Sequence, residues 1–394
     1  MISRIALITS FIVVLNVGYA GLQIWLLRRR SPWPKFIGVA VCLWALAMIG
    51  ICLLQVFEPA GWKAFMRHWL FFPLAVEMIW NLFLPLIIFP GMILAVLVVR
   101  RLRPIQHPEP LTPKGMSRRK FIYLLSCGAA PATALGMGVH GTLSRHDLRV
   151  RPFDLPIAGL PPELEGFTIA HVSDLHSGIF CGPSRLKFIR EAANDLKADL
   201  VTITGDVINH EMSEFAPALA AIQGIGSRYG TYLCEGNHDT FPGAGLVVEA
   251  CAKNNLPMLF NSCAAIPVRG RRILIAGLPW MRHGFEGRPE LVSNLYPARQ
   301  KGDLRILLAH HPHLFDVADS TDLVLTGHTH GGQIMAGPIG FGPLFFKYWS
   351  GIYQRRNTTL VVSNGCGDWF PCRIGAPAEI GLLRLTAAKA ASPV

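Results

Sequence analysis

The chain has 394 residues, a formal net charge of +12 and a mean hydropathy of +0.37, and only 16% of its residues are charged. Soluble domains carry about a quarter charged residues, so this composition excludes a wholly soluble protein and indicates a membrane region beside one sizeable soluble domain. Residues 1–145 hold 15 of the 37 Lys and Arg but 3 of the 25 Asp and Glu, which leaves 22 of each for residues 146–394. Because the positive excess accompanies apolar segments, it is typical of membrane topology rather than of a nucleic-acid-binding surface.

The N-terminal third contains three long apolar runs, at residues 5–27, 36–57 and 70–99. Each has at least the roughly 20 residues that a helix needs to cross about 30 Å of hydrocarbon. We therefore expect residues 1–100 to form an all-α region that spans the membrane three times.

Residues 101–145 are predicted to form a basic linker. Within it, Ser117-Arg-Arg-Lys-Phe121 precedes a Gly- and Ala-rich apolar stretch at 124–139, which resembles a twin-arginine export signal at an internal position. The alternative is a fourth membrane span with a basic flank. Both interpretations place the basic loops at 28–35 and 100–120 on the cytoplasmic side, so the domain that follows is expected on the outer face of the membrane.

From about residue 146 short apolar runs alternate with amphipathic stretches, which predicts an α/β layered fold with helices covering a sheet. The last predicted strands lack intervening helices, so part of the sheet is expected to be mixed or antiparallel. Strands are predicted at residues 168–173, 200–204, 231–234, 272–276, 305–309, 322–325, 360–363 and 380–385, and helices at 183–196, 214–225 and 245–253.

Clusters of polar residues directly follow five of these strands. Strands that end at one edge of an open α/β sheet bring the residues after them together. The side chains are imidazoles, carboxylates and one amide without a thiolate, a set that suits Mn, Fe, Zn or Co. The clusters are Asp174-Leu-His176, Gly205-Asp206, Gly236-Asn-His-Asp239, His310-His-Pro312 and Gly327-His-Thr-His330.

The order and spacing of these clusters resemble those of the calcineurin-like metallophosphoesterases over roughly residues 160–385. The motif Gly-His-Thr-His-Gly-Gly-Gln resembles that of their membrane-linked bacterial branch. The resemblance implies a sheet sandwich with flanking helices and two divalent metal ions. Asp174, His176 and His330 would hold one ion, Asn237, His310 and His328 the other, and Asp206 would bridge them. His238 would act as general acid, oriented by Asp239.

Several further residues are expected around this site. Asn209 stands where the family pattern has a second Asp and is expected to support the site without binding metal. His311 and Arg373 are candidates for contact with the substrate phosphate, while an ordinary surface position is the alternative for Arg373. His171 could support Asp174 from the preceding strand, His313 is expected at the surface or at a helix start, and His210 has no assigned role. Trp369, Phe370 and the aromatic stretch 341–349 could contact a lipid, although such a stretch is more often part of a core.

The resemblance implies metal-dependent hydrolysis of phosphoesters, phosphodiesters first, by a hydroxide that two metal ions activate. Lipids or other envelope phosphoesters are the expected substrates, at the outer face of the cytoplasmic membrane of a bacterium. A non-catalytic sensor of metal or phosphate is the alternative. A nuclease is disfavoured because residues 146–394 are neutral, so no nucleic-acid partner is expected.

Overall fold

The computed structural model describes residues 132–388 and, before them, residues 14, 16–18, 21, 43–47, 49, 76, 79 and 80. The chain divides into two compact units, Met1–Thr142 and Leu143–Val394. The predicted spans and the twin-arginine segment lie outside the described residues, apart from scattered helical positions and the helix at 132–144. Among the residues that are described, no helix combines the length and the apolar character needed to cross a membrane.

The second unit contains two sheets, one of five and one of six strands, and a two-stranded ribbon, β9 (Met335–Ala336) with β10 (Ile339–Gly340). In the five-stranded sheet the order is β1 (Leu148–Ile157), β13 (Ala378–Ala387), β2 (Thr168–Val172), β3 (Leu200–Thr204) and β4 (Thr231–Cys234). In the six-stranded sheet it is β11 (Gly351–Arg355), β12 (Thr358–Val362), β8 (Leu323–Thr326), β7 (Leu304–Leu308), β6 (Arg271–Gly277) and β5 (Ser262–Val268). Both sheets are mixed, because β13 runs antiparallel to β2 and both β11 and β5 run antiparallel to their neighbours.

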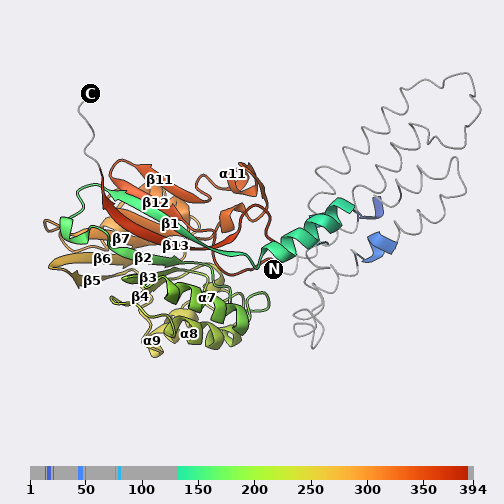
Figure 1. Cartoon of the computed structure of the whole chain (residues 1–394), viewed down its shortest axis with the longest axis horizontal. Helices are drawn as coiled ribbons and strands as arrows, with labels where there is room; N and C mark the ends of the chain where they lie inside the picture. The colour runs from blue at the N-terminus through green and yellow to red at the C-terminus, as the bar shows by residue number, and fades with distance from the viewer. Residues whose placement is uncertain are drawn as a thin grey trace, which may run out of the picture. The chain divides into compact units, whose positions relative to one another are not determined.

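The two sheets pack face to face, and alternation along the strands distributes the buried apolar side chains among three clusters. In β7, Leu304, Ile306 and Leu308 enter the cluster between the sheets, while Leu307 faces the opposite side of its sheet. Three helices cover the outer face of the five-stranded sheet (Figure 1), namely α7 (Pro183–Asp195), α8 (Phe215–Gln223) and α9 (Leu246–Lys253). Shorter elements pack on the outer face of the six-stranded sheet, including η6 (Pro312–Val317) and α10 (Glu290–Ser293).

Each strand and helix expected in residues 146–394 is present, with ends displaced by a few residues. The predicted mixed α/β fold is confirmed, and its two larger sheets agree with the sheet sandwich that the resemblance implies. The structure adds β1, β5 and β11, which lie at sheet edges. Edge strands tolerate proline and exposed polar residues because one side of the strand needs no ladder hydrogen bonds. Pro152 and Pro156 in β1 and Pro267 in β5 therefore weakened the strand pattern in the sequence.

Candidate metal centre

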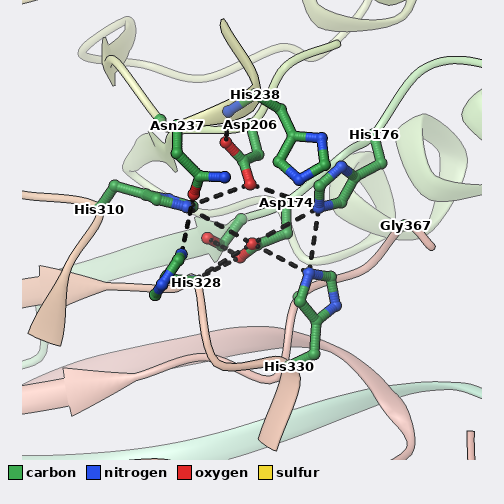
Figure 2. A network of polar contacts seen from close by, with 12 residues as sticks. Asp174, His176, Asp206, Asn237, His238, His310, His328, His330 and Gly367 are labelled. Carbon is green, nitrogen blue, oxygen red and sulfur yellow. Dashed lines mark hydrogen bonds and ion pairs between the residues drawn. The ribbon is translucent and has the colours of Figure 1, made fainter. Parts of the chain in front are cut away.

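The polar clusters meet where the carboxyl ends of strands from both sheets come together. The five-stranded sheet contributes the residues that follow β2, β3 and β4, and the six-stranded sheet contributes those that follow β7 and β8. Figure 2 shows the resulting group of side chains pointing toward one another: Asp174, His176, Asp206, Asn237, His238, His310, His328 and His330. The sequence placed these residues at one edge of a single sheet, and the structure places them at the junction of two.

Asp174, His176 and His330 form one half of the centre. The Nε2 atoms of His176 and His330 are 3.0 Å apart, and Nε2 of His330 lies 3.2 Å from Oδ1 of Asp174. One ligand atom from each of the three lies within 4.8 Å of the others, and all three side chains are buried. Two imidazole nitrogens and a carboxylate oxygen at such separations can be bridged by a single cation.

His310, His328 and Asn237 form the other half. Nδ1 of His328 lies 2.9 Å from Oδ1 of Asn237, and the ring centroids of His310 and His328 are 5.0 Å apart. Asp206 lies between the halves, because its Oδ2 is 3.1 Å from Nε2 of His310 and 3.4 Å from Nε2 of His176. This geometry matches the bridging role that the resemblance implies for Asp206.

The donor set fits divalent metal ions. Nδ1 of His310 donates to the carbonyl oxygen of Thr204 at 2.7 Å, so its Nε2 is the nitrogen that faces the carboxylates, 3.1 Å from Oδ2 of Asp206. A ligating histidine usually has its second nitrogen fixed in this way. Two carboxylates and four imidazoles without a thiolate are typical of Mn, Fe, Zn or Co sites.

The electrostatics of the cluster favour added positive charge. Burial alone would raise the pKa of Asp174, but neighbouring His330 and His176 hold it well below its ordinary value. Burial alone would also raise the pKa of Asp206, but neighbouring His310 outweighs it and holds that pKa below its ordinary value. Burial lowers the pKa of His310, yet Asp206 and Asp174 outweigh it and raise that pKa to about 9. The two carboxylates therefore remain ionised and attract a cation.

The backbone at the centre is strained. Asp174, His176, Asp206, His328 and His330 have φ between 45° and 71°, a region that costs non-glycine residues about 1–2 kcal/mol each. The neighbouring glycines let these segments pack closely, because a glycine has no Cβ. A Cβ on Gly327 would lie 1.9 Å from Oγ of Ser173, and one on Gly236 would lie 2.2 Å from the backbone nitrogen of Asp206. Strain of this kind accumulates at functional sites, where surrounding structure enforces it.

A chain of hydrogen bonds leads from His171 in β2 to the carboxylate of Asp174. Nε2 of His171 donates to Oγ1 of Thr204 at 2.9 Å, that hydroxyl donates to Oγ of Ser173 at 2.8 Å, and Ser173 donates to Asp174. Burial lowers the pKa of His171 to about 4, so its ring is neutral. His171 therefore supports Asp174 as expected, but through two hydroxyl residues that the sequence analysis did not single out.

The expected role of Asp239 needs correction. Its Oδ1 accepts from the backbone nitrogens of Val207 and Ile208, and its Oδ2 accepts from that of Gly236. Asp239 thus ties the loops after β3 and β4 together instead of orienting the His238 ring. Nδ1 of His238 donates to the backbone carbonyl of Asn209 at 2.6 Å. Asn209 orients His238, and a backbone oxygen provides the contact.

The expected contact between Arg373 and a substrate phosphate also needs correction. The Arg373 side chain is 0% exposed. Its Nε donates to Asp368 at 2.7 Å, its Nη2 donates to the carbonyl of Gly367 at 2.7 Å, and Nη2 lies 3.0 Å from Nδ1 of His330. A guanidinium with its donors engaged in this way holds the loop 364–376 and His330 in place and is not available to a substrate.

The remaining sequence candidates occupy distinct positions around the centre. His311 lies beside His328, with ring centroids 5.1 Å apart; burial and nearby His313 lower its pKa to about 3, so the ring is neutral. His313 lies in η6 and its Nε2 accepts from the backbone nitrogen of Lys347. His210 is exposed and packs on Phe241.

Aromatic rings surround the histidines. Trp280 packs against His310, His311 and His328. The other rings, Phe241, Phe285, Phe346 and Trp369, pack against His238, His311, His328 and His330 respectively. Phe346 and Trp369 were candidates from the sequence, whereas Trp280 and Phe241 were not. Trp280 follows the predicted strand at 272–276, and inspection of strand ends for aromatic as well as polar residues would have identified it.

Comparison with known proteins agrees with this geometry. Residues 167–332 match the model of the calcineurin-like phosphoesterase family. The chain carries a calcineurin-like metallophosphoesterase domain. The match covers β2 to the loop after β8 and so includes each of the seven residues proposed to bind metal.

Three relatives illustrate the range of similar proteins. An uncharacterized metallophosphoesterase of Helicobacter pylori is 29% identical over 63% of this chain and 66% of its own length. A transmembrane protein with metallophosphoesterase domain of Bos taurus is 30% identical over 61% of this chain and 57% of its own length. Phosphodiesterase YaeI of Escherichia coli is 27% identical over 68% of this chain and 99% of its own length. The chain thus spans about two thirds or less of the first two relatives.

Proposed function

We propose that this metallophosphoesterase domain hydrolyses phosphoesters, and phosphodiesters in particular, with two divalent metal ions. The observation that carries the proposal is the position of Asp206 between two groups of ligand atoms, within 3.4 Å of histidines from both. Two ions held there would polarise a phosphoryl oxygen and lower the pKa of bound water. The relative named phosphodiesterase supports a diester substrate.

The protein's own residues define the rest of the reaction. Asp174, His176 and His330 would hold one ion, Asn237, His310 and His328 would hold the other, and Asp206 would contact both. His238 is anchored through Nδ1, so when the ring is doubly protonated Nε2 is the nitrogen that delivers a proton to the leaving oxygen, and the ring becomes neutral with Nδ1–H retained. His311 lies beside His328 with a neutral ring and is placed to donate a hydrogen bond to the phosphate.

The substrate is proposed to carry an apolar group, such as the acyl chains of an envelope lipid. Aromatic rings pack on the histidines of the centre, and the adjoining segment 339–345 exposes Ile339, Leu344 and Phe345 by 64–75% of their surface. Exposed apolar residues clustered beside a site are typical of interaction with lipids or partners. Leu344→Ser with Phe345→Ser is expected to slow hydrolysis of a lipid phosphodiester in micelles and to leave a water-soluble diester unaffected; equal loss on both substrates would contradict lipid contact.

We further propose that the domain lies at the outer face of a bacterial cytoplasmic membrane, attached through the N-terminal apolar segments. The charge asymmetry of residues 1–145 and the name of the Bos taurus relative support attachment. Alkaline phosphatase fused to the C-terminus is expected to be active, because that reporter requires export. Activity only of a reporter that works in the cytoplasm would reverse the topology.

A purely metal- or phosphate-sensing protein is the alternative. A sensor requires the metal-binding residues but not an anchored general acid such as His238. The decisive assay uses the purified full chain in detergent with Mn²⁺, bis(p-nitrophenyl) phosphate and p-nitrophenyl phosphate, beside Asp206→Asn and His238→Ala. Hydrolysis that Asp206→Asn reduces by at least about 100-fold, and that His238→Ala reduces by less because p-nitrophenolate leaves without a proton, supports the enzyme. Equal rates in the three proteins would eliminate it.

A further inference from the structure

The orientation of His238 depends on the backbone of the loop after β3. The carbonyl oxygen of Asn209 can only accept, so Nδ1 of His238 carries the proton in the 2.6 Å bond between them. One ring nitrogen of His238 lies within 4.8 Å of the ligand atoms of His176 and Asp206, and Figure 2 shows the ring beside His176. The precise position of the Asn209 carbonyl therefore determines where the second nitrogen of His238 points.

The carboxylate of Glu214 holds that loop. Its Oε2 accepts from three successive backbone nitrogens, those of Asn209 at 3.0 Å, His210 at 2.6 Å and Glu211 at 3.0 Å. The backbone carbonyl of Glu214 in turn accepts from Oγ of Ser177 at 2.7 Å. Glu214 thus connects the peptide that orients His238 to the turn that follows Asp174 and His176.

A helix-capping role explains only part of this arrangement. Glu211 and Glu214 form a capping box around η4 (Met212–Glu214), in which the Glu214 side chain accepts from the nitrogen of Glu211. That contact completes the cap. The bonds from Asn209 and His210 lie outside η4 and add nothing to the helix, whereas they fix the residues that lead to the Asn209 carbonyl.

We propose that Glu214 is a positioning residue for His238: its carboxylate fixes the 209–211 backbone, and this backbone holds the Nδ1–H of His238. The catalytic consequence rests on the proposed function, because His238 matters there as the proton donor to the leaving oxygen. Charge-assisted hydrogen bonds are stronger than neutral ones, so Glu214→Gln is expected to loosen the loop while it retains an acceptor and the fold.

The first experiment measures this loosening without metal. In the metal-free full chain with ¹⁵N-labelled histidine, NMR is expected to show His238 as the Nδ1–H tautomer, and Glu214→Gln is expected to shift it toward a mixture of tautomers. Glu211→Gln is the matched control, because it removes the same charge from the same capping box, in which the Glu211 side chain accepts from the backbone nitrogen of Glu214. An unchanged His238 signal in Glu214→Gln, with a lower melting temperature, would assign Glu214 to the helix cap alone and overturn the proposal.

The second experiment uses the Mn²⁺-loaded protein and two diesters that differ in the leaving group. A poor leaving group such as an alkoxide needs the proton from His238, whereas p-nitrophenolate does not. Glu214→Gln is expected to lower kcat about tenfold for the alkyl ester and less than about twofold for the p-nitrophenyl ester, with metal content unchanged. Equal losses on both esters would overturn the catalytic consequence. If the unmodified protein hydrolyses neither ester, the proposed function fails, and the tautomer measurement still decides the role of Glu214.

Discussion

His176 and His330 direct their Nε2 atoms at one another across 3.0 Å, although 154 residues separate them in the sequence. His176 follows β2 in the five-stranded sheet and His330 follows β8 in the six-stranded sheet. Two imidazoles brought this close beside the carboxylate of Asp174 make a stable arrangement when a cation lies between them. The junction of the two sheets therefore forms one half of the candidate metal centre.

Removal of one ligand from either half should release the ion of that half and leave the other ion bound. His330→Ala disrupts the half with Asp174 and His176, and His328→Ala disrupts the half with Asn237 and His310. Each variant is expected to retain about one of two ions and to lose at least about 100-fold in kcat, because both ions act on the same phosphate. Inductively coupled plasma mass spectrometry of dialysed protein measures the stoichiometry.

His313→Ala is the matched control for these variants. His313 is also a histidine after β7, but its Nε2 accepts from the backbone of Lys347 and does not face the cluster. It should retain both ions. Loss of both ions from His328→Ala and His330→Ala alike would show that the halves do not bind independently.

Gly327 is expected to be intolerant of a methyl group. A Cβ there would lie 1.9 Å from Oγ of Ser173 and 2.2 Å from Oδ2 of Asp174, so Gly327→Ala must displace the Asp174 carboxylate. We expect a loss of about 1–3 kcal/mol in the free energy of unfolding and weaker binding of metal in titration calorimetry. Gly226→Ala is the control, because the nearest atom to its Cβ would be Oδ1 of Asn194 at 3.8 Å. Equal metal affinity in both variants would contradict this account of Gly327.

The sequence predicted the interior strands and the polar residues that follow them, because both leave strong local signals. Strands such as β3 and β7 are short apolar runs with turn residues at their ends. Edge strands β1, β5 and β11 carry prolines or half-exposed side chains, so their pattern is weak in the sequence and is completed by pairing with a neighbour.

The side chains of the centre were predictable as a set, while their support was not. Asp239 and Asn209 illustrate the reason. The sequence suggests that a carboxylate beside His238 should orient it, but which oxygen reaches Nδ1 depends on the path of two loops. That path brings the Asn209 carbonyl to His238 and points the Asp239 carboxylate at three backbone nitrogens. Arg373 is a similar case, since only the fold shows that its guanidinium is enclosed.

Arg373 is expected to act through stability rather than through substrate binding. Arg373→Met leaves the Asp368 carboxylate, 2% exposed, without its partner, and loss of one member of a buried ion pair costs about 3–5 kcal/mol. Urea denaturation should show this loss, and the double variant with Asp368→Leu should recover part of it. A normal free energy of unfolding with a raised KM alone would restore the phosphate-binding interpretation.

The ion pair between Arg272 and Asp303 should make stability depend on pH. Asp303 accepts from Nε and Nη2 of Arg272 at 3.0 and 2.7 Å and from the backbone nitrogen of Gln300 at 2.8 Å. Burial alone would raise the pKa of Asp303, but these contacts lower it below its ordinary value. The unfolded chain, with a pKa of about 3.9, therefore binds a proton more readily than the folded domain.

The stabilisation from Asp303 is therefore complete above about pH 4 and disappears as the pH falls through the lower pKa of the folded state. Asp303→Asn should be less stable than the unmodified chain by about 2 kcal/mol at pH 7, and this difference should shrink toward pH 3. Urea denaturation at a series of pH values measures both. Asp154→Asn is the control, because its pair with Arg384 is 3.8 Å long with both side chains more than half exposed, and such pairs contribute little at any pH. A difference for Asp303→Asn that stays constant from pH 7 to pH 3 would show that its carboxylate has no lowered pKa.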